Sequence, residues 1–363
     1  MNRIAELKTY KRHDSNFEIF ERLDPVHRQQ IIMHDLAVKL RSSRRKNVKN
    51  VRATMIRATN PGIRNLRLLK VKQPKFADFG KQLAFVRSYA DLRRDRLAEI
   101  VDQQANIVSY FGQNGFLHRD RTKWTLELLS GVQGAVSQLG MPLKHFGYCP
   151  RPMDYSPKVM PVIQTPSHST FPSGHACEAF AVATVMEFLT RRSLLPVTQA
   201  NPRPKLNIAE IDNFFMNLKS YSSMRIAARI AENRVVAGVH FPVDNAAGAL
   251  VGTILGLYFV WAMAGRWDPK PQQSNYQNLS TIPKFRMYGP NWDKDFNLEI
   301  FQQKLISGRN NMNKRYYRYI IDPALTELGL DPLLPVENAT PLLIDLWNKA
   351  RAEWYPVIGT KGK

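Results

Sequence analysis

The sequence predicts an all-α fold. Nine segments of the 363 residues repeat apolar side chains with helical periodicity, and the alternation of apolar and polar residues that marks strands is almost absent. The strongest helical pattern runs from residue 175 to residue 189 with neither proline nor glycine. A chain of this length can bury the core of one or two domains, so we expect a helical bundle.

The expected helices, in chain order, cover residues 14–24, 26–41, 80–111, 121–138, 175–191, 207–233, 243–264, 294–306 and 338–354. The last begins with Thr340 as N-cap and Pro341 at its first position, both favoured there. It places five apolar side chains on one face, which packs on the core or on a second copy of the chain: Leu343, Leu346, Trp347, Ala350 and Trp354.

One expected helix contains an uncharged run, residues 246–265, that is long enough to cross a membrane. Every other expected helix carries charges, so no second span is available to pair with it. A central helix of the bundle is therefore the favoured interpretation. We divide the chain into a basic N-terminal helical arm (1–78), a catalytic helical bundle (79–265) and a C-terminal extension ending in the amphipathic helix (266–363).

The chain is strongly basic, with a formal net charge of +22. Residues 39–75 contribute thirteen basic side chains, and the stretch contains neither an acidic nor an aromatic residue before Phe76. The stretch favours an anionic partner, namely a phosphorylated substrate, a membrane surface or nucleic acid, although the missing aromatics argue against base stacking. A solvated face, or an arm wrapped around the bundle, explains it equally well.

The N-terminal residues lack the apolar stretch of a secretory signal. Cys149 and Cys177 are too few for a disulfide framework and suit a reducing compartment. We therefore expect a cytoplasmic protein, with peripheral membrane contact through residues 39–75 as the alternative.

Three short blocks contain the candidate site residues: Lys144 and Arg151, then Ser173, Gly174 and His175, then Arg234, His240 and Asp244. These side chains have the chemistry that a tetrahedral oxyanion requires. Cations neutralise its oxygens, a Ser-Gly turn at a helix start donates hydrogen bonds, and two histidines can divide attack and proton transfer. Each block alone also fits an ordinary loop, turn or buried ion pair, so their combination carries the prediction.

Together the blocks resemble the signature of the phosphatidic acid phosphatase type 2 and vanadium haloperoxidase superfamily. Its pattern is Lys-x6-Arg-Pro, then Pro-Ser-Gly-His, then Ser-Arg-x5-His-x3-Asp, and only Asn233 departs from it, standing where the pattern has serine. The resemblance covers residues 144–244. The wide gap between His175 and Arg234 is similar to that in the soluble, haloperoxidase-like bacterial branch.

The resemblance implies a role for each residue and the helical bundle typical of the superfamily. His240 would be the nucleophile that forms a phosphohistidine, oriented by Asp244 through Nδ1, and His175 would be the general acid and base. The remaining residues would bind the equatorial oxygens: Lys144, Arg151, Arg234, Ser173 and Gly174. Since His240 must be neutral while His175 is charged, a bell-shaped pH profile is expected.

The same signature serves two chemistries. A phosphohydrolase needs no cofactor, whereas a haloperoxidase binds vanadate on His240 and oxidises halide with hydrogen peroxide. The cationic charge favours a phosphorylated substrate, so the phosphohydrolase is preferred. A third interpretation is a phosphate or polyanion binding protein without turnover, which Asn233 invites; the retention of two histidines and Asp244 argues for catalysis.

Overall fold

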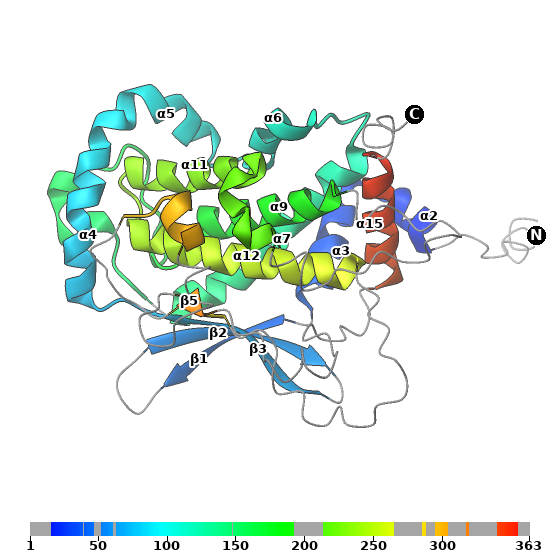
Figure 1. Cartoon of the computed structure of the whole chain (residues 1–363), viewed down its shortest axis with the longest axis horizontal. Coiled ribbons are helices and arrows are strands. Elements are labelled where there is room, and N and C mark those ends of the chain that lie inside the picture. The colour runs from blue at the N-terminus through cyan, green and yellow to red at the C-terminus, as the bar shows by residue number, and fades with distance from the viewer. Residues whose placement is uncertain are drawn as a thin grey trace, which may run out of the picture.

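The computed structural model describes residues 16–38, 40–46, 52–60, 63–146, 148–191, 213–264, 285–287, 295–303, 317–318 and 340–354. In this part of the chain a bundle of helices lies above a small β-sheet (Figure 1). The central helices are α7 (Lys123–Phe146), α9 (Gly174–Leu189), α11 (Ser222–Val236) and α12 (Pro242–Ala264). The helical bundle expected from the sequence is thereby confirmed.

Shorter elements surround the central helices. At one end of the bundle lie α4 (Phe76–Ser88), η1 (Tyr89–Leu92) and α5 (Arg93–Asp102). From there η2 (Val108–Phe111) and α6 (Gly112–Gly115) lead back along the bundle, where Gly115 lies close to Trp354. Toward the other end lie α2 (Asn16–Glu21), α3 (Pro25–Ala37) and α15 (Pro341–Ala352). The connections between the longer helices contain the short helical turns α8 (Pro152–Tyr155), η3 (Pro157–Val159) and η5 (Leu218–Ser220). Residues 213–216 and 298–303 are also helical.

Glycines allow α12 to pack directly on the backbone of α9. A Cβ at Gly252 would lie 2.2 Å from the carbonyl oxygen of Cys177, and one at Gly248 would lie 2.6 Å from that of Ser173. Side chains at these positions would force the helices apart. The close approach places the start of α12 beside the start of α9, where two of the predicted motifs lie.

Within the described residues, α12 is the one helix long and apolar enough to cross a membrane, and 88% of its most apolar window is buried inside the protein. Neighbouring helices therefore cover the apolar surface of α12. A central bundle helix, as the sequence favours, has this environment.

The terminal amphipathic helix is confirmed in α15. Thr340 Oγ1 accepts a hydrogen bond from the amide of Leu343 at 3.3 Å, and Pro341 occupies the first position. The predicted apolar face is buried against the bundle. Glu353, just after the helix, accepts hydrogen bonds from the amides of Trp124 at 2.8 Å and Thr125 at 2.9 Å and so caps the start of α7.

The sheet was not predicted. It contains β1 (Leu40–Lys46), β2 (Arg52–Asn60), β3 (Ile63–Lys72), β4 (Phe285–Met287) and β5 (Tyr317–Arg318), in that order, with β3 and β4 parallel and the other neighbours antiparallel. The prediction of a helical arm over residues 1–78 is therefore wrong beyond α3. The buried side chains of Leu40 and Val71 join the bundle core.

The basic residues of the arm explain the error, because they interrupt the apolar alternation that marks a strand. Apart from Lys75, which precedes α4, the basic side chains of residues 39–75 lie outside the described part of the chain, so their binding role stays a prediction. Most of the extension 266–363 also lies outside it, and the domain boundaries at 78 and 265 stay predictions too.

Some helix boundaries also differ from the predictions. The helix expected over 80–111 is divided into α4, η1, α5 and η2. Arg93, at the start of α5, donates hydrogen bonds to the carbonyls of Val236, Met160 and Val159 at 2.8–2.9 Å. These contacts with residues distant in the sequence fix the turn between α4 and α5, and no local sequence pattern predicts them. Conversely, α7 continues past the expected end at residue 138, through Pro142, and so carries Lys144.

Candidate active site

The eight predicted site residues meet where the last turns of α7 and α11 approach the first turns of α8, α9 and α12. The amide of Ser173 donates to the carbonyl of Asp244 at 3.0 Å and joins the starts of α9 and α12. A cavity of about 230 Å³ lies between these ends. Six of the eight predicted residues line it: Lys144, Arg151, Gly174, His175, Arg234 and His240.

His240 is buried, with contacts at both ring nitrogens. Its Nδ1 lies 3.2 Å from Oδ2 of Asp244, and its Nε2 lies 3.4 Å from Nη1 of Arg151. Because a guanidinium can only donate, Nε2 is the unprotonated nitrogen and Nδ1 carries the proton. Burial, Arg151 and Lys144 lower the pKa of His240 well below its usual value. The ring is therefore neutral, with the lone pair of Nε2 beside Arg151.

Asp244 is fully buried beneath this histidine. Its Oδ2 accepts hydrogen bonds from the hydroxyl of Thr170 at 2.5 Å and from the amide of Phe241 at 2.8 Å. Burial raises the pKa of Asp244 to about 6, against the opposing effect of these donors. At neutral pH the carboxylate is therefore ionised and can orient His240. Thr170 Oγ1 also lies 3.1 Å from Nδ1 of that histidine.

Backbone carbonyls hold the guanidinium of Arg151 in place. Its Nη1 donates to the carbonyl of Val239 at 2.6 Å and its Nε to that of His168 at 3.1 Å. The amide of Arg151 donates to Oδ2 of Asp154 at 2.7 Å, which fixes the start of α8. The charge is buried without a carboxylate partner on the guanidinium among the described residues, as an anion site requires.

Two further buried cations complete the cavity. Lys144 Nζ donates to the carbonyl of Ser169 at 2.9 Å, and burial with the nearby Arg151 lowers the pKa of Lys144 to about 8. Burial also lowers the pKa of Arg234 to about 10, so Arg234 stays charged. In the described part of the chain, Nε and Nη1 of Arg234 have no hydrogen-bond partner. Such orphaned, charged donors are costly, and an oxyanion in the cavity would satisfy them.

His175 lies on the same cavity. Its Nε2 is 3.1 Å from the carbonyl oxygen of Gln103, which can only accept, so Nε2 carries a proton and Nδ1 is the nitrogen free to exchange one. Burial and the nearby Arg234 lower the pKa of His175 to about 3. The expected charged His175 is therefore not found in the free site. A bound anion would raise this pKa, because it stabilises the imidazolium.

Gln103, just after α5, connects two site residues and was missed by sequence reasoning. Its fully buried Oε1 accepts from Nη2 of Arg234 and from Nδ2 of Asn233, both at 3.1 Å. Oδ1 of Asn233 lies 3.3 Å from Nη1 of Arg96, which donates to it. Asn233 thus bridges Arg96 and Gln103, and its longer side chain makes contacts that differ from those open to the serine of the pattern.

Sequence reasoning also missed Thr170. The Oγ of Ser173 is the N-cap of α9, where it accepts from the amide of Ala176 at 3.5 Å, and the expected contact of Ser173 with a bound anion stays a prediction. Thr170 lies three residues before Ser173, so a search around the second block could have found it. No sequence signal identifies Gln103, because it lies 41 residues before Lys144, just after a different helix.

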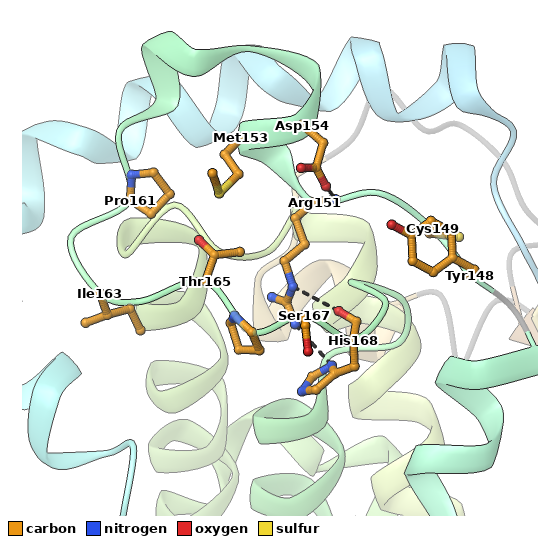
Figure 2. A pocket seen from close by; sticks show the side chains of 11 residues that line it. Tyr148, Cys149, Arg151, Met153, Asp154, Pro161, Ile163, Thr165, Ser167 and His168 are labelled. Carbon is orange, nitrogen blue, oxygen red and sulfur yellow. Dashed lines mark hydrogen bonds between the residues drawn. The ribbon is translucent and has the colours of Figure 1, made fainter.

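A second, larger hollow of about 490 Å³ adjoins this cavity. Figure 2 shows Arg151 reaching into it, with dashed hydrogen bonds to His168. Arg151, Ile163, Pro166 and His168 line both spaces. The exposed side chains of Tyr148 and Met153 also border the larger one.

Comparison with known proteins gives one family. Residues 125–268 match the model of the PAP2 superfamily, and this range contains all eight predicted site residues. No curated protein matches the chain. Phosphatases make up most of this superfamily, so the match supports a hydrolase with phosphatase-type activity. The segment from residue 125 to residue 268 belongs to the PAP2 superfamily.

Proposed function

We propose that the protein is a phosphohydrolase that cleaves a phosphate ester or anhydride through a phosphohistidine on His240. The observation that carries the proposal is a neutral imidazole whose Nε2 lone pair adjoins Arg151, in a cavity where Arg234 has unpaired donors. A nucleophile beside preorganised cations is the arrangement that phosphoryl transfer requires.

In the first step, Nε2 of His240 attacks phosphorus, the N–P bond forms and the bond to the leaving oxygen breaks. The buried cations neutralise the equatorial oxygens, whose charge is greatest in the transition state. Asp244 stabilises the positive charge that develops on the imidazole. His175, once the bound anion has raised its pKa, donates the proton on Nδ1 to the leaving oxygen.

In the second step, Nδ1 of His175 accepts a proton from water while the water oxygen attacks phosphorus. The N–P bond breaks, inorganic phosphate is released and the neutral His240 is restored. One residue thus acts first as acid and then as base, as microscopic reversibility requires.

The same residues also suit vanadate, because Nε2 of His240 and the orphaned donors of Arg234 fit any tetrahedral oxyanion. If vanadate were bound there, it would supply peroxide activation, and the protein would be a haloperoxidase.

The test is an orthovanadate titration of chelator-treated protein, with phosphate release from an aryl phosphate followed beside peroxide-dependent bromide oxidation. We expect hydrolysis without vanadate and its loss as vanadate is added. Bromide oxidation that appears only with vanadate would instead establish a haloperoxidase.

A His240→Ala variant separates catalysis from binding alone. It should lose phosphate release by about a thousandfold or more, whereas a binding protein would keep its affinity for the anion. His118→Ala, at an exposed histidine, is the matched control and should leave activity unchanged.

A further inference from the structure

A carboxyl group lies on the wall of the catalytic cavity, where the proposed mechanism gives it no role. Glu178 is one turn after His175 on α9 and lines the cavity together with Lys144. Its Oε2 accepts a hydrogen bond from Nε2 of Gln133 at 3.1 Å, and Ser137 also bonds to the carboxyl group. Both partners come from α7, so two helices fix the position of this side chain.

The second carboxyl oxygen points toward the anion-binding end of α9. A Cβ placed on Gly174 would lie 3.9 Å from Oε1 of Glu178 and 3.7 Å from Cε of Lys144. The carboxyl group and the lysine chain therefore flank the first residue of the helix, whose amides and dipole favour an anion.

An ionised carboxylate at this place would repel a phosphoryl group, whereas a neutral carboxyl group can donate a hydrogen bond to it. Burial raises the pKa of Glu178 to about 7, although Gln133, Ser137 and Lys144 act in the opposite direction. The neutral form is thus readily reached near neutral pH, and a bound anion would favour it further.

We propose that Glu178 is a further oxyanion-binding residue, which donates a hydrogen bond from its neutral carboxyl group to the bound phosphoryl group. The role deepens the proposed function, because it concerns the ligand of the same cavity. Its consequence is that an anion binds together with a proton, so the site selects oxyanions more strongly as the pH falls.

Other titratable groups face the same cavity and must be separated from Glu178. They are Lys144 on α7, Arg151 and His168 before α9, His175 and Cys177 on α9, Arg234 on α11 and His240 before α12. Burial lowers the pKa of His175 to about 3 and raises that of Cys177 to about 12, so neither group titrates near neutral pH before an anion binds. Lys144, with a pKa of about 8, would also take up a proton when an anion binds, and so would His175 once the anion has raised its pKa. A variant that removes only the titration of Glu178 keeps both of these contributions.

The test is calorimetric titration of the full chain with sulfate, which stays a dianion throughout the neutral range. Measurement in two buffers of different ionisation enthalpy gives the number of protons taken up. Sulfate binding in the cavity is identified as the binding heat that wild type shows and an Arg234→Met variant lacks. The part of the wild-type uptake that belongs to Glu178 should be large at about pH 7.5 and small at about pH 6, where Glu178 is already protonated.

Glu178→Gln keeps a hydrogen-bond donor without a titrating group, so its uptake at about pH 7.5 should be lower than that of wild type by more than about half a proton, the rest coming from Lys144 and His175. Glu187→Gln is the matched control, because Glu187 lies on the same helix, bonds to Ser223 and does not line the cavity. It should behave as wild type.

Equal uptake in Glu178→Gln and wild type would overturn the role of Glu178. So would a difference between wild type and Glu178→Gln that is as large at about pH 6 as at about pH 7.5. Phosphate release from an aryl phosphate, measured on the same samples, separates the two proposals. Proton-linked binding without hydrolysis would refute the phosphohydrolase alone, and hydrolysis without sulfate binding in the cavity would overturn the role of Glu178 alone. Absence of both would overturn both proposals.

Discussion

At the scale of single residues, the site depends on groups that fix the orientation of the reacting ones. Gln103 is the strongest example, since its side chain holds Arg234 and its backbone carbonyl holds His175. It touches neither the phosphoryl group nor the nucleophile in the proposed mechanism, so it is a positioning residue. Asn233 supports it from α11.

We expect Gln103→Leu to lower kcat/KM for a phosphate ester by about 10- to 100-fold, because a hydrogen bond to a charged group contributes about 1.5–3 kcal/mol. The vanadate inhibition constant should rise in parallel, as Arg234 loses its partner. The control is Gln302→Leu, at a buried glutamine that bonds Met216 and Lys219 instead. Gln103 would have no positioning role if both variants lowered the free energy of unfolding and neither changed the vanadate inhibition constant.

Two buried groups of the proposed mechanism bound the pH profile of kcat/KM, and the loss of the Glu178 proton would add to its alkaline limb. Below about 6, Asp244 becomes protonated and can no longer accept the Nδ1 proton of His240, so activity falls. Above about 8, Lys144 loses the positive charge that stabilises the transition state, so activity falls again. A bell-shaped profile is expected, and Lys144→Arg should move its alkaline limb to higher pH. An unmoved limb would show that another group causes it.

At the scale of elements, the contact between α9 and α12 sets the distance between the predicted anion-binding turn at Ser173 and the predicted nucleophile His240. Gly248 and Gly252 let the two backbones touch, and the hydrogen bond from Ser173 to Asp244 joins the helix starts. The spacing of the second and third motifs in three dimensions is therefore a property of this helix pair.

Gly252→Ala tests the contact, because its Cβ would lie 2.2 Å from the carbonyl oxygen of Cys177. We expect a loss of about 1–3 kcal/mol in the free energy of unfolding, measured by denaturant titration, together with reduced activity. Gly80→Ala is the matched control: no atom lies within 4 Å of its Cβ, and alanine favours a helix. A neutral Gly252→Ala would mean that the helices can separate freely.

At the scale of the whole molecule, the part of the chain matched by the family is not self-sufficient. Gln103 lies before the matched range 125–268, yet it orients two site residues. Glu353 lies after that range, yet it caps the start of α7. The central helices also bury side chains of α3 and α4, such as Ile32 and Val86.

A fragment covering residues 121–268 should therefore show neither cooperative unfolding nor phosphate release. Circular dichroism during heating and the aryl phosphate assay, with the full chain beside it, provide the measurements. Hydrolysis by the fragment within about tenfold of the full chain would contradict this dependence.

The sequence predicted the bundle and most of the site for a physical reason. Phosphoryl transfer needs particular side chains, so His240, Asp244 and the three cations remain recognisable wherever they lie in the chain. Gln103 was not predictable, because its contribution depends on a contact made only after folding. The strands of residues 40–72 were missed since their basic residues hide the apolar alternation.

Because Nε and Nη1 of Arg234 have no hydrogen-bond partner among the described residues, the anions of the buffer affect the stability of this fold. Any tetrahedral anion that enters the cavity binds the native chain and not the unfolded one, so it raises the melting temperature by mass action. A stability measured in phosphate or sulfate buffer therefore includes the affinity of the site. Measured in an amine buffer with chloride, the same chain should unfold at a lower temperature, and the difference reports occupancy of the cavity without any substrate being turned over.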